Sequence, residues 1–431
     1  MKIFKKLQSN EILLVLADSS FLYFILSVIF SQIAINMMNV VLIFLIFFLT
    51  SSNFLVSVLI AAFMVPQILL SFFGGVIADL RDKKIILFYG NILRGIILLL
   101  LFLNSTSVPL IYFVTLFVAI ATQFYIPAET PVIPKLLNNK HLTAGNSVFG
   151  VAMFGSVMIG YVLAGPAINF FGRSDVFILI SGLLFIATIF IYLIPSSKLK
   201  SNNVGDLGYS IFGMRGFVRD NLRGTFAMLR KTKGVVGAFI LLSISQVIIL
   251  ILGAIIPGYA KTILEVDPEK FSLLLFAPAS FGMIIASFMI GSLFCKTNKE
   301  KLMTWGLFLS GLVFCLLPFT SKIVSKAFVQ FFNQFLPNFL VIDTVHLAVF
   351  LAFFAGFSNA LVFIPSQTVI QENVPEDFRS KVYGLLFSVV GLLSLIPILA
   401  SGGIADILGV GTVLFIIGFS LLLLGVFKVF V

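Results

Sequence analysis

Charged residues are scarce in this sequence. Asp, Glu, Lys and Arg together make up only 10% of its 431 residues, whereas 60% of the residues are hydrophobic. A soluble globular domain has roughly one quarter charged residues, because polar side chains must cover much of its surface. The shortage of charge therefore excludes a soluble protein and predicts an integral membrane protein.

Cysteine and histidine are almost absent, with two residues of each. Cys295 and Cys315 have no metal-ligand partner at a useful spacing, so both are expected to act as apolar side chains. The sequence also has no P-loop, no HExxH motif, no paired catalytic carboxylates and no glycine-rich dinucleotide turn. We therefore expect neither enzyme activity nor a metal or cofactor.

Long apolar segments make up most of the chain. Each of twelve segments is long enough for a helix to cross the hydrocarbon core, which takes about 20 residues. The apolar runs are continuous and lack the alternation of a barrel wall, so the predicted fold class is all-α. The predicted spans lie near residues 21–49, 54–78, 85–103, 108–128, 144–170, 175–195, 234–260, 271–294, 302–320, 346–371, 382–404 and 410–430.

Basic residues are distributed unevenly between the two sides of the predicted helices. Of the 28 Lys and Arg residues, the connections opposite to the N-terminus hold only Arg173, Lys261, Lys270, Lys322 and Lys326. The positive-inside rule then predicts that both termini are cytoplasmic. The same bias accounts for the net charge of +11, so no nucleic-acid partner is expected.

The two halves of the chain resemble each other. Residues 74–95 align with residues 290–311, which pairs the glycines at 75, 90 and 95 with those at 291, 306 and 311. A second alignment pairs Pro127 with Pro365. The predicted domains are a six-helix bundle over 1–195, a linker with a basic amphipathic helix over 196–233, and a second six-helix bundle over 234–431. Internal symmetry of this kind is typical of transporters whose two bundles rock about a midplane site.

One connection carries a recognisable motif. Residues 75–84, GVIADLRDKK, resemble the signature loop between the second and third helices of the major facilitator superfamily. Gly75, Asp79, Lys83 and Lys84 match that pattern, while Leu80 and Asp82 depart from it. Residues 127–150 and 365–384 resemble the macrolide-efflux-like, drug:proton antiporter branch. The resemblance implies a monomer with two pseudo-symmetric six-helix bundles in the plasma membrane of a prokaryote.

The motif also has a direct physical interpretation. The Asp79 carboxylate can lie at the positive end of a neighbouring helix dipole, and Gly75 allows that helix to approach closely. Arg81, Lys83 and Lys84 can tether the loop to carboxylates or lipid headgroups. The resemblance implies that this cluster stabilises the outward-open state. The alternative is that these charges only set the membrane orientation.

The fifth predicted span is rich in glycine and ends its motif in Gly-Pro. It resembles the antiporter motif of exporters, and Gly160, Gly165 and Pro166 are predicted to form a helix pivot. Ionisable residues within spans are few, and in a bilayer they are functional candidates. Glu129 is the candidate for proton coupling, and Arg94 either joins it or extends toward the membrane surface. The repeat places the uncharged Gln367 opposite Glu129.

The family architecture lines a central cavity with the first, fourth, seventh and tenth helices. An apolar cavity with a few polar groups suits a bulky hydrophobic ligand, although each polar residue can instead bond a neighbouring helix. The candidates are Gln32, Asn36, Asn39, Gln123, Ser243, Gln246, Ser358 and Asn359. Outside this set, residues 321–343 form a long amphipathic segment expected on the outer leaflet, where it gates a lateral entrance or only covers the periphery.

These observations favour a secondary transporter that exports small hydrophobic or amphipathic molecules by alternating access. The expected partners are membrane lipids, a small hydrophobic substrate, and a proton or another coupling ion. Two alternatives stay open. One is a lipid or lysophospholipid transporter, and the other is a transport-inactive membrane receptor or assembly partner with the same fold.

Overall fold

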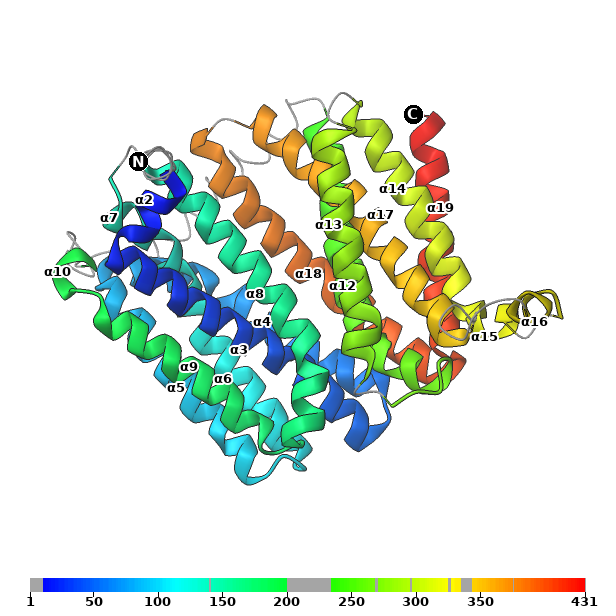
Figure 1. Cartoon of the computed structure of the whole chain (residues 1–431), viewed down its shortest axis with the longest axis horizontal. Coiled ribbons are helices and arrows are strands. Elements are labelled where there is room, and N and C mark those ends of the chain that lie inside the picture. The colour runs from blue at the N-terminus through cyan, green and yellow to red at the C-terminus, as the bar shows by residue number, and fades with distance from the viewer. Residues whose placement is uncertain are drawn as a thin grey trace. The chain divides into compact units, whose positions relative to one another are not determined.

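The computed structural model describes residues 11–138, 141–199, 234–267, 270–294, 297–324, 327–334, 343–374 and 376–430. In those ranges every regular element is a helix, as Figure 1 shows. The predicted linker helix within 196–233 falls almost wholly outside the described residues, apart from the short helix α10 (Ser196–Leu199).

The described chain contains twelve helices that are long and apolar enough to cross a membrane, which confirms the predicted number. The eighth of them begins with a π-helical turn, Ser272–Phe276, so that this span runs from Ser272 to Ile290. The twelve are α3 (Ser19–Thr50), α4 (Asn53–Leu80), α5 (Lys83–Leu103), α6 (Val108–Glu129), α8 (Leu142–Phe171), α9 (Val176–Leu193), α12 (Val235–Thr262), α13 (Ala277–Ser292), α14 (Lys299–Leu316), α17 (Thr344–Asn373), α18 (Glu376–Leu408) and α19 (Val410–Phe430).

Polar side chains mark where several of these helices begin. The Asp18 carboxylate accepts hydrogen bonds from the backbone N–H groups of Ser20 and Phe21, at 2.8 and 3.1 Å. Asp343 accepts one from the N–H of His346 at 2.7 Å, at the start of α17. The first N–H groups of a helix have no partner within it, so each cap satisfies one or two of them.

The chain divides into two compact units. The first consists of Met1–Leu49 and Ala62–Asp206, and the second of Thr50–Ala61 and Leu207–Val431. Helix α4 is therefore shared, with its first turns in the second unit and the remainder in the first. In the first unit α5 packs against α6 and α9, whereas in the second unit α14 packs against α17 and α19.

The aligned glycines of the repeat occupy equivalent helix contacts in the two units. An ideal Cβ on Gly90 of α5 would lie 3.0 Å from a ring carbon of Tyr125 in α6. Its counterpart Gly306 of α14 faces α17, where the same atom would lie 2.9 Å from the carbonyl oxygen of Ser358. Side chains larger than hydrogen would separate these helices, so the glycines set how closely each pair packs.

The second pair of aligned glycines repeats this arrangement one or two turns later. A Cβ on Gly95 would lie 2.7 Å from the ring of Phe185 in α9. A Cβ on Gly311 would lie 2.7 Å from Leu422 and 2.9 Å from the carbonyl oxygen of Gly418 in α19. The sequence repeat thus corresponds to two helix triplets, α5 with α6 and α9, and α14 with α17 and α19.

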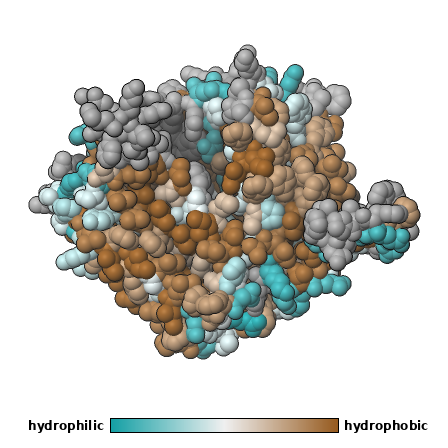
Figure 2. All heavy atoms as spheres, in the orientation of Figure 1, coloured by the Kyte–Doolittle hydropathy of each residue, from teal (hydrophilic) through white to brown (hydrophobic). Residues whose placement is uncertain are grey.

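Large hydrophobic side chains cover much of the face seen in Figure 2, where they are brown. Phe170, Phe288 and Ile396 are each at least three-quarters exposed. Such exposure is unfavourable in water and favourable in hydrocarbon. The surface therefore agrees with a protein whose helices face lipid.

The contact between α13 and α17 offers a test of glycine-mediated packing. A Cβ on Gly356 of α17 would lie 1.8 Å from the backbone oxygen of Ala279 in α13. We expect Gly356→Ala to lower the free energy of unfolding by about 1–3 kcal/mol, the usual cost of overpacking. Unfolding of the detergent-solubilised protein, followed by circular dichroism, measures this change.

Gly182→Ala is the matched control, because nothing lies within 4 Å of a Cβ built at Gly182 in α9. A helical Gly-to-Ala change without a clash stabilises by about 0.5–1 kcal/mol. Equal stability of the Gly356→Ala variant and the unchanged protein would contradict the close-packing interpretation.

Candidate functional site

Two ionisable side chains are buried in the interior of the first unit. Arg94 of α5 is 1% exposed, and Glu129, the last residue of α6, is 2% exposed. Buried charges are costly unless other groups compensate them. The partners of these two side chains therefore define the site.

Arg94 is held by groups from α3, α5 and α6. Its Nε donates a hydrogen bond to the Gly90 carbonyl oxygen at 3.2 Å, and its terminal nitrogen donates to Ser31 Oγ at 3.2 Å and to Asn91 Oδ1 at 2.5 Å. The guanidinium carbon lies 3.9 Å from the ring centroid of Tyr125. The side chain thus stays inside the unit, stacked on an aromatic face, and does not extend toward the membrane surface.

Glu129 lies one helical turn beyond Tyr125, within electrostatic range of Arg94. The Gln32 side chain of α3 hydrogen-bonds its carboxyl group, while Oε1 is buried without a hydrogen-bond partner among the described residues. Gln32 Oε1 in turn accepts from Asn36 Nδ2 at 3.4 Å. A carboxyl group with a free oxygen and a nearby fixed cation is chemically able to take up and release a proton.

The second unit carries uncharged residues at the equivalent positions. The repeat aligns Ser310 with Arg94 and Gln367 with Glu129. Ser310 Oγ donates to Ser358 Oγ at 2.8 Å, which is a neutral contact between α14 and α17. Arg94 and Glu129 of the first unit are ionisable, whereas their counterparts Ser310 and Gln367 in the second unit are not.

The candidate cavity residues of the first unit fall on α3 and α6. Asn36 Nδ2 donates to the Gln32 carbonyl oxygen at 2.7 Å, and Gln123 Nε2 donates to the Ala119 carbonyl oxygen at 3.3 Å. Asn39 Oδ1 is buried and has no partner within the described chain. Asn39 therefore keeps an acceptor that a ligand can use, whereas Gln123 uses one of its donors within its own helix.

The candidates of the second unit fall on α12 and α17. Ser243 donates to the Phe239 carbonyl oxygen at 2.8 Å, and the fully buried Ser358 donates to that of Ala355 at 3.0 Å. Asn359 Nδ2 donates to Ser245 Oγ at 2.8 Å, so it joins α17 to α12, but its Oδ1 is buried without a partner in the described structure. Gln246 is partly buried on α12.

The loop between α4 and α5 uses its basic residues in different ways. Arg81 is exposed and Lys83 is buried. Lys84 Nζ donates to the carbonyl oxygens of Tyr192 and Ile194, at 2.9 and 2.6 Å, and to Ser196 Oγ at 3.3 Å. Lys84 therefore caps the C-terminus of α9, whose last carbonyls have no partner within the helix and carry partial negative charge. Gly75 and Asp79 lie in α4, with side-chain environments outside the described set.

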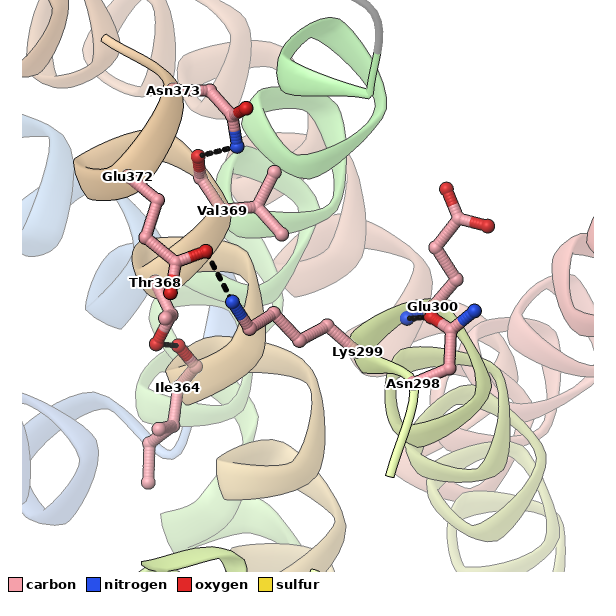
Figure 3. A network of polar contacts seen from close by, with 8 residues as sticks. All are labelled: Asn298, Lys299, Glu300, Ile364, Thr368, Val369, Glu372 and Asn373. Atoms are coloured by element: carbon pink, nitrogen blue, oxygen red, sulfur yellow. Dashed lines mark hydrogen bonds and ion pairs between the residues drawn. The ribbon is translucent and has the colours of Figure 1, made fainter. Parts of the chain in front are cut away.

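The corresponding loop of the second unit forms an ion pair. Figure 3 shows Lys299, at the start of α14, reaching the Glu372 carboxylate near the end of α17. Asn298 caps α14 by accepting from the N–H of Glu300 at 2.8 Å. Lys299 aligns with Lys83 in the repeat, so a basic residue is kept at this position in both units.

The predicted pivot lies within one continuous helix. Gly165 and Pro166 are inside α8, which runs from Leu142 to Phe171. A Cβ on Gly160 would lie 2.8 Å from the Ile33 carbonyl oxygen, so α8 approaches α3 closely there. The predicted outer segment 321–343 contains parts of two short helices, α15 (Thr320–Val324) and α16 (Ala327–Asn333), and residues 335–342 lie outside the described chain.

In the described chain, twelve helices are long and apolar enough to cross a membrane, and the two units repeat equivalent glycine contacts, an arrangement typical of a multi-pass transporter. A model of the Major Facilitator Superfamily matches residues 24–336. The chain belongs to the Major Facilitator Superfamily and is a secondary transporter, not an enzyme.

Individual relatives agree with this assignment. The uncharacterized MFS-type transporter YfiS of Bacillus subtilis (strain 168) is 24% identical over 379 residues, covering 86% of this chain and 82% of YfiS. A mutant of the nucleoside transporter NupG has a similar structure, with a TM-score of 0.72 and 14% identity over 95% of this chain and 99% of that one. The POT family transporter PepTSo gives a TM-score of 0.71 and 12% identity over 96% and 97%. The structural likenesses show the fold.

The Lys84 cap can be tested by stability. We expect Lys84→Ala to lower the free energy of unfolding by about 0.3–1 kcal/mol, because a cation near a helix C-terminus contributes that much. Lys301→Ala, at an exposed position in the first turn of α14, is the control and should not lower stability, because a cation at a helix N-terminus is not favoured by the dipole. Thermal unfolding in detergent compares the two variants. A Lys84→Ala protein as stable as the control would show that the cap contributes nothing.

Proposed function

We propose that this chain exports small hydrophobic or amphipathic molecules by alternating access, in exchange for protons carried by Glu129. In this proposal the bundles 1–195 and 234–431, joined by the linker 196–233, rock about a substrate site in the plasma membrane of a prokaryote. Both termini are cytoplasmic, the chain acts as a monomer, and it falls in the macrolide-efflux-like branch. Orientation rests on the positive-inside bias, and the branch rests on the motifs at 127–150 and 365–384.

The observation that carries the proposal is the buried Glu129 carboxyl group, which has one unpartnered oxygen and lies within electrostatic range of Arg94. Arg94 is fixed by Ser31, Asn91 and Tyr125. When Glu129 is ionised, the pair is neutral overall. When Glu129 binds a proton, the guanidinium is left as an uncompensated positive charge in a medium of low dielectric constant.

This change of charge supplies a mechanism for exchange. A cationic substrate near the pair is tolerated when Glu129 is ionised and repelled when Glu129 is protonated, because Coulomb interactions are strong where water is excluded. The hydrogen-bonded chain from Asn36 through Gln32 to Glu129 links the pair to the candidate substrate residues of α3. Proton and substrate thus compete without needing the same atoms.

The polar groups of the two units favour a particular kind of substrate. Asn39 in the first unit and Asn359 in the second each keep a buried amide oxygen free among the described residues. Both are acceptors, so they suit a ligand with N–H or O–H donors. The surrounding helices are predominantly apolar, which fits an amphipathic amine better than a sugar or an acid.

Glu129→Gln tests the coupling. A pump-deficient bacterium that expresses the unchanged chain should extrude ethidium faster than the empty host, and a protonophore should abolish the difference. Because glutamine keeps the shape of Glu129 but does not exchange a proton, we expect its protonophore-sensitive efflux to fall to the level of the empty host. Fluorescence of preloaded cells measures the rate.

Glu265→Gln is the matched control, since Glu265 is an exposed residue in the connection after α12, and its efflux should equal that of the unchanged chain. Protonophore-sensitive efflux by the Glu129→Gln variant would remove Glu129 from the mechanism. Absence of ethidium efflux by the unchanged chain would contradict the exporter proposal, and labelled lysophospholipid would then be the substrate to assay.

A further inference from the structure

The first turns of α4 are bound by a carboxylate from the far end of the sequence. Residues Thr50–Ala61 belong to the second unit, although the rest of α4 belongs to the first. Asp406, two residues before the end of α18, lies at the beginning of α4. The contact therefore fastens a helix that the two units share.

Four hydrogen bonds make up this contact. Asp406 Oδ1 accepts from the backbone N–H of Asn53 at 2.7 Å and from Asn53 Nδ2 at 2.9 Å. Oδ2 accepts from Ser52 Oγ at 2.6 Å and from the backbone N–H of Phe54 at 3.1 Å. A carboxylate that binds the first N–H groups of a helix is stabilised by charge-assisted hydrogen bonds and by the helix dipole. Asp406 thus acts as a cap for a helix more than 340 positions away.

Close packing lies beside these hydrogen bonds, at Ser57 and Asn53, whereas Asp406 itself is exposed. A Cβ on Gly402 of α18 would lie 2.1 Å from Ser57 Oγ, and a Cβ on Gly258 of α12 would lie 2.3 Å from Asn53 Oδ1. Lys261, at the end of α12, donates from Nζ to Ser51 Oγ at 2.9 Å. Ser57 is fully buried as a result. A small separation of α4 from α12 and α18 would therefore break this packing and expose Ser57.

The sequence repeat shows that this acid is peculiar to the second half. Residues 165–172, GPAINFFG, align with residues 402–409, GGIADILG, and place Asn169 opposite Asp406. Gly172 and Gly409 close both segments with positive φ, 89° and 86°. Asp79 is an acid found only in the first half, because the repeat aligns it with Cys295. Each half thus supplies one acid, and the two are associated with opposite ends of α4.

We propose that Asp406 is a gating residue that holds the first turns of α4 against α18 in one transport state and releases them in the other. The contact closes the predicted outer end of α4. The family resemblance assigns Asp79, at the other end of the same helix, to the opposite state. The two acids therefore act against each other, and the loss of one shifts the equilibrium toward the state that the other stabilises.

Cysteine accessibility measures this equilibrium without substrate or gradient. The full chain carries Ser57→Cys as the reporter, with Cys295→Ser and Cys315→Ser to remove the native thiols. A membrane-impermeant maleimide is added to intact cells, and the rate of labelling at position 57 is followed. Because Ser57 is fully buried in the closed contact, labelling of the reporter protein should be slow.

Asp406→Asn should raise the labelling rate about tenfold, since it removes the charge and replaces one accepting oxygen by an NH2 group that cannot accept. Ser52→Ala, which removes one donor and leaves the carboxylate, should raise it less. Asp267→Asn makes the same chemical change at an exposed residue paired with Lys270 and should leave the rate unchanged. Adding Asp79→Asn to Asp406→Asn should bring the rate back toward that of the reporter protein.

An unchanged labelling rate in Asp406→Asn would overturn the proposal, provided that its thermal unfolding matches that of the reporter protein. If Asp406→Asn does not fold, Ser52→Ala decides, and a rate equal to that of the reporter protein overturns the proposal. If Asp406→Asn changes the labelling rate in inverted vesicles but not in intact cells, Asp406 is still a gating residue, but this end of α4 faces the cytoplasm and the predicted orientation is wrong. Failure of the Glu129 proposal leaves this assay unaffected, because labelling involves neither substrate nor proton gradient.

Discussion

Hydrocarbon offers no water to a polar group, and each donor and acceptor inside the membrane must find its partner within the protein. The hydroxyls of Thr115, Thr122 and Thr188 each donate to the carbonyl oxygen four residues earlier, at 2.7 to 2.9 Å. Against this background, the unpartnered oxygens of Glu129, Asn39 and Asn359 in the described chain are exceptions. A buried polar atom without a partner costs free energy, and the proposed function uses these three among the seven such atoms of the described residues.

The same constraint explains why sequence analysis succeeded with the helices. Continuous apolar segments must form helices in lipid, so length and composition were enough to predict twelve spans. The glycine repeat was also visible, because close helix contacts require small residues at fixed spacing. The family followed from the loop at 75–84. These features are local in sequence, and local patterns are what a single sequence displays.

Contacts between distant segments left little trace in the sequence. Nothing near Lys84 indicates that the carbonyls of Tyr192 and Ile194 are its partners. Glu129 was identified because an acid near a span is rare, but its link through Gln32 to Asn36 depends on how α3 packs against α6. Asp406 was missed altogether. Its one sequence signal was the difference from Asn169 in the repeat, which a comparison of the two halves reveals.

A transporter that alternates between two states needs their free energies to differ by only a few kcal/mol, because a larger gap leaves one state almost unpopulated. If the two halves made identical contacts with the two ends of α4, symmetry would keep the free energies of the two states similar. This chain departs from symmetry in charge, since Asp79 and Asp406 lie in different halves. A single charge-assisted contact contributes about 1.5–3 kcal/mol, which shifts the ratio of the two states by roughly 10- to 150-fold. In the proposed cycle two opposed contacts of the same chemical kind offset each other, so each state is held firmly while the difference between them stays small.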